Sequence, residues 1–397
     1  MPSSAFDNVY AIAAVSIGLA LLASVLSARV GLSVALVEII VGVAAGNLFH
    51  LGTNDWIDFL AGSGSVMLTF LAGAEIDPAS LRRFAAPAGV IGGIGFAAPF
   101  AAACAFAWFG LHWHWQAAQI AGVALSTTSV AVVYAVMVET GLNQTDLGKL
   151  ILTACFVCDL GTVGALGVLF ASYDLLLLAF LGVTGVVLLV LPRALPHVLR
   201  AVGHPVGEPE VKVVLLLLFG LGGLAAAARS EAVLPAYLVG LVAAGTLQQH
   251  PQLLRRIRAI GFAFLTPIFF LKAGTLISLS AVIAGLGWVV LLFVAKVAAK
   301  VAGVLPATRA FGMRGRQAWY TTMMMSTGLT FGSISALFGL THGYLDRAQY
   351  SVLVTVVVLT ALIPTLVAQL LFFPRVHGLT WGATARAAVE PEPAAPR

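Results

Sequence analysis

The sequence predicts an all-α polytopic membrane protein with about 13 transmembrane helices. Hydrophobic residues make up 60% of the 397 residues and charged residues only 9%, whereas about 25% of residues are charged in an average soluble domain. The mean hydropathy is +1.02, and the apolar residues come in runs of about 20, the length of a helix that crosses a hydrocarbon core. These runs lack strand alternation, so they indicate helices and not a barrel.

Thirteen spans follow the apolar runs in order. The first run lacks the basic n-region and cleavage pattern of a signal peptide, so we expect it to remain as a span. The eighth and ninth spans are short and separated by only Arg229, Ser230 and Glu231. The predicted spans are 8–28, 32–50, 57–75, 84–109, 115–138, 147–171, 174–194, 210–228, 231–247, 260–278, 281–305, 317–340 and 347–373.

The basic residues between the spans predict the orientation. Connections after odd-numbered spans, together with the C-terminal tail, hold 16 Lys and Arg residues, whereas connections after even-numbered spans hold 2. The positive-inside rule then places the N-terminus outside and the C-terminus in the cytoplasm. The net charge of +5 is thus explained by topology and requires no nucleic-acid partner. We expect residues 1–375 to form the transmembrane domain and residues 376–397 a short disordered cytoplasmic tail.

Several soluble chemistries are not indicated. The sequence has no GxGxxG after a strand and no P-loop, so no nucleotide-binding domain and no cofactor are expected. It has no Ser/His/Asp or paired-carboxylate arrangement, so we do not expect an enzyme. Cys104, Cys155 and Cys158 lie in apolar runs and predict no disulfide framework. The Cys-x-x-Cys spacing of the last two has no partner His, so we interpret both as small packing residues.

Five charged residues remain inside the predicted spans, and each costs about 2.5–3.5 kcal/mol on insertion scales. They are Glu38, Asp159, Lys272, Lys296 and Lys300. Such residues are by default part of an ion path or a proton relay. The protein therefore uses charge inside the bilayer for a function beyond residing there.

Asp159 is the most informative of these residues. It lies about 12 residues into its span, or ~18 Å along the helix, close to the bilayer midplane. Burial disfavours the charged carboxylate, whereas a nearby lysine or metal ion favours it. Such a group can exchange a proton for a cation. The alternative is an acid that stays protonated and hydrogen-bonds to a neighbouring helix.

The three lysines have different expectations. Lys296 and Lys300 share one helix face, which is unfavourable unless an acidic or aqueous environment lies opposite. Lys300 lies near the cytoplasmic end of its span, where snorkelling is the alternative. Lys272 lies near the middle of its span and cannot snorkel easily. All three are candidate electrostatic partners of Asp159.

Two spans contain polar interruptions where a helix can open. One holds Ser126–Ser129, with Thr127 and Thr128 between, and the other holds Ser326–Gly332. Hydroxyl side chains compete for backbone hydrogen bonds and glycine loosens a helix, so the second opening is expected at Ser326, Thr327, Gly328 and Thr330. The two spans are seven apart and antiparallel, as in inverted repeats that match spans 4–6 with spans 11–13. The alternative is that the hydroxyls hold neighbouring helices together.

These residues resemble the monovalent cation:proton antiporter-2 family, which includes sodium/proton exchangers and Kef-type potassium systems. The matching segments occur in the family's order and cover nearly the whole chain. They are Phe70–Asp77, Ala124–Val133, Asp159, Pro267–Phe270, Lys300 with Gly303, and Ser326–Gly332.

The resemblance implies a sodium/proton antiporter-like fold with two crossed, discontinuous helices. It implies core helices at about 84–171 and 281–373, with the remainder serving as scaffold and dimerisation domain. The expected protein is a homodimer in the bacterial inner (plasma) membrane that works by elevator-like alternating access. Asp159 resembles the carboxylate that binds the ion or the proton, and Lys300 the core lysine, although depth alone favours Lys296 slightly.

The expected function is secondary antiport of a monovalent cation, Na⁺ or K⁺, against H⁺. Many sodium-transporting relatives have two adjacent acids where this chain has Cys158 and Asp159, so a single carboxylate predicts electroneutral exchange. We expect Cys158, Thr127, Thr128 and Ser129 to complete the ion- and proton-binding site. Lys272 also departs from the family pattern. Three lysines against two acids keep an anion or organic-substrate carrier open, and a channel or a non-transporting membrane sensor is a further alternative.

Overall fold

The computed structural model describes residues 9–30, 34–49, 54–170, 175–202, 208–228 and 232–374. Every regular element in these ranges is a helix. The predicted tail at 376–397 lies outside the described residues. In chain order the elements are α1 (Val9–Val30), α2 (Val34–Leu48), α3 (Asp55–Ala74), α4 (Pro78–Arg83), α5 (Ala85–Ala105), η2 (Phe106–Gly110), α6 (Trp115–Ser126), α7 (Val130–Glu139), η3 (Leu142–Gln144), α8 (Asp146–Leu169), α9 (Leu175–Val202), α10 (Pro209–Ala227), α11 (Val233–Gln249), α12 (Pro251–Ile260), η4 (Gly261–Leu265), α13 (Thr266–Thr275), α14 (Leu279–Ala284), α15 (Leu286–Ala310), α16 (Arg316–Met325), α17 (Thr330–Thr341) and α18 (Arg347–Phe372).

Each of the thirteen predicted spans has a helical counterpart. Among the described residues, ten helical segments are long and apolar enough to cross a membrane, and α2 and α11 are shorter apolar helices. The remaining span is built from α6 and α7 in two pieces. The chain is therefore an integral membrane protein with an all-helical bundle.

The tenth span begins earlier than the sequence predicts. The prediction was 260–278, but the helical segment is continuous from Pro251 to Thr275. Pro251 occupies the first turn of α12, where a missing N–H costs nothing. Leu253 and Ile257 are buried on one face of α12 while three arginines occupy other positions. This amphipathic turn was mistaken for a connection because its average hydropathy is low.

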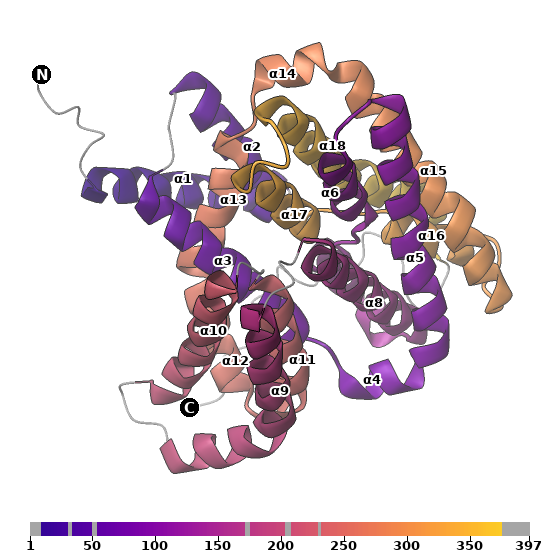
Figure 1. Cartoon of the computed structure of the whole chain (residues 1–397). Helices are drawn as coiled ribbons and strands as arrows, with labels where there is room; N and C mark the ends of the chain where they lie inside the picture. The colour runs from indigo at the N-terminus through magenta and orange to yellow at the C-terminus, as the bar shows by residue number, and fades with distance from the viewer. Residues whose placement is uncertain are drawn as a thin grey trace, which may run out of the picture.

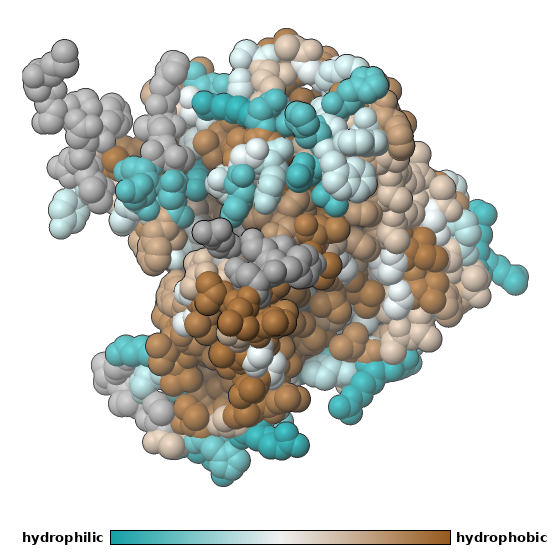
Figure 2. All heavy atoms as spheres, viewed as in Figure 1, coloured by the Kyte–Doolittle hydropathy of each residue, from teal (hydrophilic) through white to brown (hydrophobic). Residues whose placement is uncertain are grey.

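The surface carries the apolar belt expected of a bilayer protein. In Figure 2 hydrophilic residues gather along the upper edge near α14 and along the lower edge near α4, with hydrophobic residues between them. Large apolar side chains such as Leu178, Leu189 and Leu216 are exposed on α9 and α10. In water such exposed apolar side chains would promote aggregation, whereas the acyl chains of lipid solvate them.

Two triplets of elements repeat along the chain. In each, a long helix precedes an interrupted helix and a second long helix follows, as α5, α6/α7 and α8, and again as α15, α16/α17 and α18. Figure 1 shows α5, α6, α8, α15, α16 and α18 gathered on one side of the molecule, and α3, α9, α10, α11 and α12 on the other. This pairing matches the predicted repeat of spans 4–6 and 11–13.

Glycines let the backbones of α3 and α11 approach closely. A Cβ atom on Gly240 would lie 2.1 Å from the carbonyl oxygen of Phe70, and one on Gly73 would lie 2.3 Å from that of Tyr237. Small residues at helix interfaces are the usual means of close packing in membranes, where no hydrophobic force drives helices together. The α3–α11 pair is therefore closely packed, and α11 also contacts α8 of the first triplet.

We predict that Gly240→Ala lowers the free energy of unfolding by about 1–3 kcal/mol, because a backbone must move to admit the methyl group. The measurement is thermal melting of the purified protein in detergent. Gly245→Ala is the matched control, because it lies on the same helix and its Cβ would meet nothing within 4 Å. Equal melting temperatures for the two variants would contradict the close-packing interpretation.

Candidate functional site

The two interrupted helices meet at their breaks. The first break, Thr127–Ser129 between α6 and α7, and the second, Thr327–Leu329 between α16 and α17, are fully buried or nearly so. The hydroxyl of Thr128 donates a hydrogen bond of 2.9 Å to the carbonyl of Met325, the last residue of α16. The hydroxyls of Ser129 and Thr330 lie 3.4 Å apart. The predicted openings therefore exist and contact one another in the middle of the bundle.

Hydroxyl side chains end each half-helix, as the sequence predicts. Ser126 and Thr127 donate to the carbonyls three residues before them, at 2.8 and 3.2 Å. At the end of α16, Ser326 donates to the carbonyl of Thr322, four residues before it, and Thr327 to that of Met324, three residues before it, each at 2.8 Å. These bonds satisfy carbonyl groups that a continuous helix would otherwise use, so the chain can leave the helical path without orphaned acceptors.

Asp159 lies beside this crossing. It is on α8, 1% exposed, and its carboxylate interacts with the backbone N–H of Thr128 and the charge of Lys300. Its Oδ1 atom is buried and has no hydrogen-bond partner within the protein. A buried carboxylate oxygen without a partner is costly. The oxygen is thus available to a proton or to a cation.

Helix ends set the local electrostatics. The first residues of α7 and α17, Val130 and Thr330, line a cavity of about 40 Å³ together with Asp159. The N-terminal end of a helix carries a partial positive charge. Two such ends face the carboxylate and reduce the cost of its ionised form, as discontinuous helices do for anionic groups in other membrane proteins.

Lys300 connects the two breaks to α8. Its Nζ atom donates to the hydroxyl of Thr128 at 3.0 Å and to the sulfur of Cys158 at 3.6 Å. Lys300 is fully buried, so the snorkelling alternative is not what the structure shows. Thr128 in turn donates to the carbonyl of Met325, the last residue of α16. Through this hydrogen-bond chain the ammonium group offsets the partial negative charge at the C-terminal end of α16.

Lys296 occupies the equivalent place at the second break. Its Nζ donates to Thr360 at 3.0 Å, and Thr360 in turn donates to the carbonyl of Val357 at 2.8 Å and reaches that of Gly328 at 3.4 Å. A Cβ atom at Gly328 would lie 2.4 Å from the lysine nitrogen. Gly328 is therefore the residue that makes room for this ammonium group.

Lys272 is not part of this group. The sequence suggests it as a partner of Asp159, but the structure pairs its Nζ with Asp58 Oδ1 at 2.9 Å. The reason is packing: α13 lies against α2 and α3, and Asp58 sits in the first turn of α3. Lys272 is 8% exposed while the Asp58 side chain is 47% exposed. The ion pair compensates the buried lysine on the scaffold side of the molecule.

A route leads from Asp159 toward the end of the bundle that holds Arg83 and Lys149, which we call the basic face. The small cavity at Asp159 shares Glu75 and Val130 with a larger cavity of about 210 Å³. Glu75 forms an ion pair of 2.6 Å with Arg258, and both line the larger cavity. The sequence did not indicate this contact, because the two residues are far apart in the chain.

An acidic group stands at the mouth of this route. Asp77 lines the larger cavity, and the hydroxyl of Ser80 donates to its carboxylate at 2.5 Å. This hydrogen bond, with further ones from the backbone N–H groups of Ala79 and Ser80, holds the pKa of Asp77 below its usual value. The carboxylate is therefore ionised at neutral pH and counters the positive charge of Lys149, which lines the same cavity.

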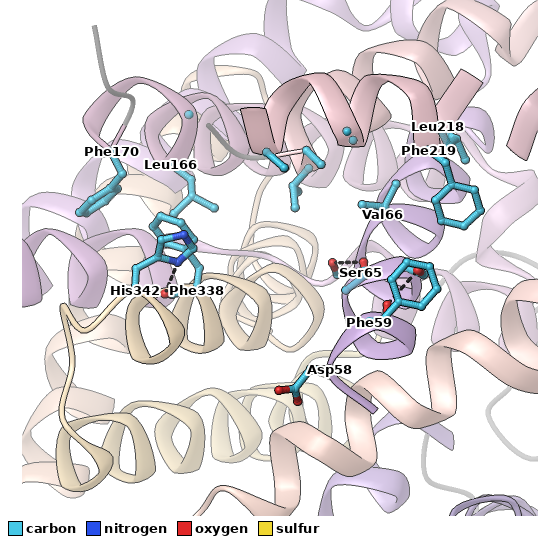
Figure 3. A pocket seen from close by; sticks show the side chains of 18 of the residues that line it. Asp58, Phe59, Ser65, Val66, Leu166, Phe170, Leu218, Phe219, Phe338 and His342 are labelled. Atoms are coloured by element: carbon cyan, nitrogen blue, oxygen red, sulfur yellow. Dashed lines mark hydrogen bonds between the residues drawn. The ribbon is translucent and has the colours of Figure 1, made fainter. Parts of the chain in front are cut away.

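A second, larger cavity lies at the other end of α8. It measures about 930 Å³ and is lined by scaffold residues such as Phe59 and Phe219 and by Leu166, Phe170 and Phe338 of the repeat helices. Figure 3 shows these aromatic side chains around the space, with Asp58 at its border. Asp159 does not line it. Of these three cavities, Asp159 lines the small one on the side of the basic face.

A buried carboxylate between two opened helices in a polytopic bundle defines a secondary ion transporter. The chain belongs to the family described as "Sodium/hydrogen exchanger, transmembrane", whose model matches residues 17–373. It is 24% identical over 351 residues to "Probable Na(+)/H(+) antiporter 3" of Methanocaldococcus jannaschii, covering 86% of this chain and 89% of the relative. The family makes it a cation:proton exchanger and not an enzyme.

Two further proteins are similar. YjbQ of Bacillus subtilis (strain 168), which bears the name of a Na(+)/H(+) antiporter, is 26% identical over 273 residues, and the alignment spans 62% of this chain and 44% of that longer relative. The solved structure of the sodium proton antiporter MjNhaP1 from Methanocaldococcus jannaschii at pH 8 matches with a TM-score of 0.68 and 14% identity, covering 90% and 95% of the two chains. That match shows the antiporter fold.

We predict that Asp58→Asn lowers the free energy of unfolding by about 1–3 kcal/mol, because it leaves the Lys272 ammonium buried without its counter-ion. The double variant with Lys272→Met should recover most of the loss in thermal melting. Asp55→Asn is the control, since it removes a carboxylate from the same first turn of α3. If it costs as much as Asp58→Asn, the helix dipole and not the ion pair accounts for the effect.

Proposed function

We propose that this protein exchanges Na⁺ or K⁺ for H⁺ through Asp159. The unpartnered Oδ1 of this buried carboxylate, placed at the crossing of two opened helices, is the observation that carries the proposal. In one half of the cycle the carboxylate holds a proton, and in the other it holds a monovalent cation. Because both loads neutralise the same group, they compete for it, which is the basis of antiport.

The remaining cation ligands are oxygen atoms at the breaks. Thr330 lines the small cavity together with Asp159, and its hydroxyl lies 3.4 Å from that of Ser129 in the other break. We propose that Thr127, Thr128 and Ser129 supply further hydroxyl and carbonyl oxygens once the cation is bound. Hard oxygen ligands suit alkali cations, and opened helices are the usual source of such ligands in transporters. Cys158 takes the place of the second acid, and its contact with Lys300 leaves Asp159 as the single exchanging carboxylate.

Alternating access follows from the two sets of cavities. The core helices at about 84–171 and 281–373 carry Asp159 and both breaks, and we propose that they move as one body against the scaffold formed by the rest of the chain. In the present state the carboxylate communicates with the basic face. The large cavity on the opposite side marks where the interface of core and scaffold can open after an elevator-like movement.

The orientation and assembly are part of the same proposal. The asymmetry of 16 against 2 basic residues between spans supports a cytoplasmic basic face, with the N-terminus outside. We place the protein in the bacterial inner membrane as a homodimer that associates through the scaffold. The exposed apolar side chains of α9 can face lipid or pack against a second copy of the chain.

The placement of the lysines favours cation exchange over the anion-carrier alternative. Lys300 and Lys296 donate to threonines at the breaks, and Lys272 is paired with Asp58. None is left facing the cavity of Asp159 as a free anion-binding charge, judged by the residues that line it. Asp159 is therefore the substrate-binding charge of this cavity, because the other carboxylate that lines it, Glu75, is paired with Arg258.

We predict that Asp159→Asn abolishes exchange, because an amide can neither release a proton nor neutralise a cation. The measurement is proton flux in proteoliposomes after pulses of Na⁺, K⁺ or Li⁺, with the activity falling to that of empty vesicles. Glu38→Gln is the matched control, since Glu38 is a second carboxylate buried in the membrane, 3% exposed on α2, and should leave exchange intact.

The same assay separates the alternatives. If cation-dependent proton flux persists in the Asp159→Asn variant, the result contradicts the proposal and favours the carrier of anions or organic substrates. Single-channel currents, or the absence of any saturable exchange in the wild type, would favour the channel or the sensor.

We predict that exchange is electroneutral, because one carboxylate holds one proton or one monovalent cation. A potential-sensitive dye in proteoliposomes should report no transport-linked charge movement, and an imposed membrane potential should not change the initial rate. A conducting ionophore added at the end confirms that the dye responds. A dye signal that depends on both the cation gradient and Asp159 would overturn the one-to-one stoichiometry.

A further inference from the structure

Three sulfur atoms gather next to the crossing, and sulfur is a poor ligand for alkali cations. Cys155 and Cys158 are free thiols on α8, and the thiol of Cys155 lies 3.6 Å from the thioether sulfur of Met325 on α16. All three side chains are fully buried. From the sequence alone the two cysteines are expected only to pack, because no third ligand is visible. The fold supplies that ligand from a residue 170 positions away.

The second thiol faces the same place. Cys158 is one turn beyond Cys155 on α8, a spacing that puts both side chains on one face, and the two are within electrostatic range of each other. Its sulfur contacts the Lys300 ammonium at 3.6 Å and the Thr128 hydroxyl at 3.3 Å. A Cβ on Gly95 would lie 3.1 Å from the methyl group of Met325 and 3.9 Å from Lys300 Nζ. The sulfurs and the ammonium therefore share one small region.

We propose that Cys155, Cys158 and Met325 form a binding site for a soft monovalent metal ion, Cu⁺ or Ag⁺. Thiolate and thioether ligands select such ions, whereas oxygen ligands select alkali cations. No group of three His, Cys, Asp or Glu ligands occurs in the described part of the chain, so the methionine distinguishes this site from a zinc site.

The distance between the sulfurs of Cys155 and Met325 is close to that in a three-coordinate site. A metal–thiolate bond of about 2.3 Å, as in zinc sites, places the sulfurs of a planar trigonal set ~4 Å apart. The 3.6 Å between Cys155 and Met325 is short by a few tenths of an ångström. Methionine is unbranched and flexible, so a small rotation of its side chain opens the required distance.

Lys300 makes the charges balance. Binding breaks two S–H bonds, forms two metal–thiolate bonds and releases two protons, with no change in oxidation state. The metal contributes one positive charge, the two thiolates contribute two negative charges, and the adjacent Lys300 ammonium contributes one positive charge. The loaded site is neutral, which a buried environment requires. Asp159, the residue after Cys158, lines the route to the basic face by which the ion enters and the protons leave.

The test is titration of the purified full chain with Cu⁺ under anaerobic conditions, in competition with a chromophoric Cu⁺ chelator. We expect one Cu⁺ per chain and a rise in melting temperature on binding. Met325→Leu preserves side-chain volume and removes the thioether, and Cys155→Ala removes one thiolate. Each should weaken binding by at least about tenfold.

Cys104→Ala is the matched control, because this buried thiol lies on α5 outside the cluster and should bind Cu⁺ like the wild type. Melting without metal shows whether each variant is folded. The proposal is overturned if the wild type binds no Cu⁺, or if folded Met325→Leu and Cys155→Ala variants bind as tightly as the wild type. It is also overturned if Cys104→Ala removes the site. Alkali-cation exchange is measured separately, so neither proposal depends on the other.

Discussion

The hydrogen-bonded crossing of the two helix breaks is the constraint on which the rest of the molecule depends. Lipid offers no partner to an open backbone, so an interrupted helix in a membrane must find partners inside the protein. Here each break uses a lysine and a threonine: Lys300 reaches the carbonyl of Met325 through Thr128, and Lys296 reaches Gly328 through Thr360. The ammonium groups thus stabilise carbonyl ends, while the helix N-termini remain turned toward Asp159. This division of charges keeps a carboxylate ionisable in an otherwise apolar bundle.

Much of this arrangement could be predicted from the sequence because it depends on local properties. Apolar runs indicated the thirteen spans, and hydroxyl and glycine residues indicated the openings at Thr127–Ser129 and Ser326–Thr330. The amphipathic α12 was missed because averaged hydropathy dilutes two buried residues among arginines. Depth in the membrane could not show which of Lys296 and Lys300 is the core lysine, since the two residues differ by only one helical turn. Only their partners on α6/α7 and α18 show which break each one serves.

Features that arise from packing between distant segments were beyond sequence analysis. Lys272 was assigned to Asp159 as a candidate partner, because its actual partner, Asp58, is contributed by a helix more than 200 residues earlier. The same holds for the ion pair of Glu75 with Arg258 and for the sulfur of Met325 beside Cys155. Each contact depends on the orientation of α3, α12, α13 or α16 about its own axis. That orientation is set by packing against neighbouring helices and determines which side chains meet. Residue type sets what a side chain can bind, while packing decides what it meets.

The replacement of a second acid by Cys158 has consequences for coupling. In this site the Lys300 ammonium is hydrogen-bonded to Thr128 and Cys158, so Asp159 Oδ1 is left without a protein partner. In the proposed elevator-like cycle, a carboxylate without a proton or a cation would carry its charge through a low-dielectric interface as the core moves, at a large cost in solvation. A carboxylate that holds a proton or a cation would be neutral and would move without that penalty. On this proposal the empty carrier does not cross, so the same desolvation that makes Asp159 expensive to bury would couple cation movement to proton movement.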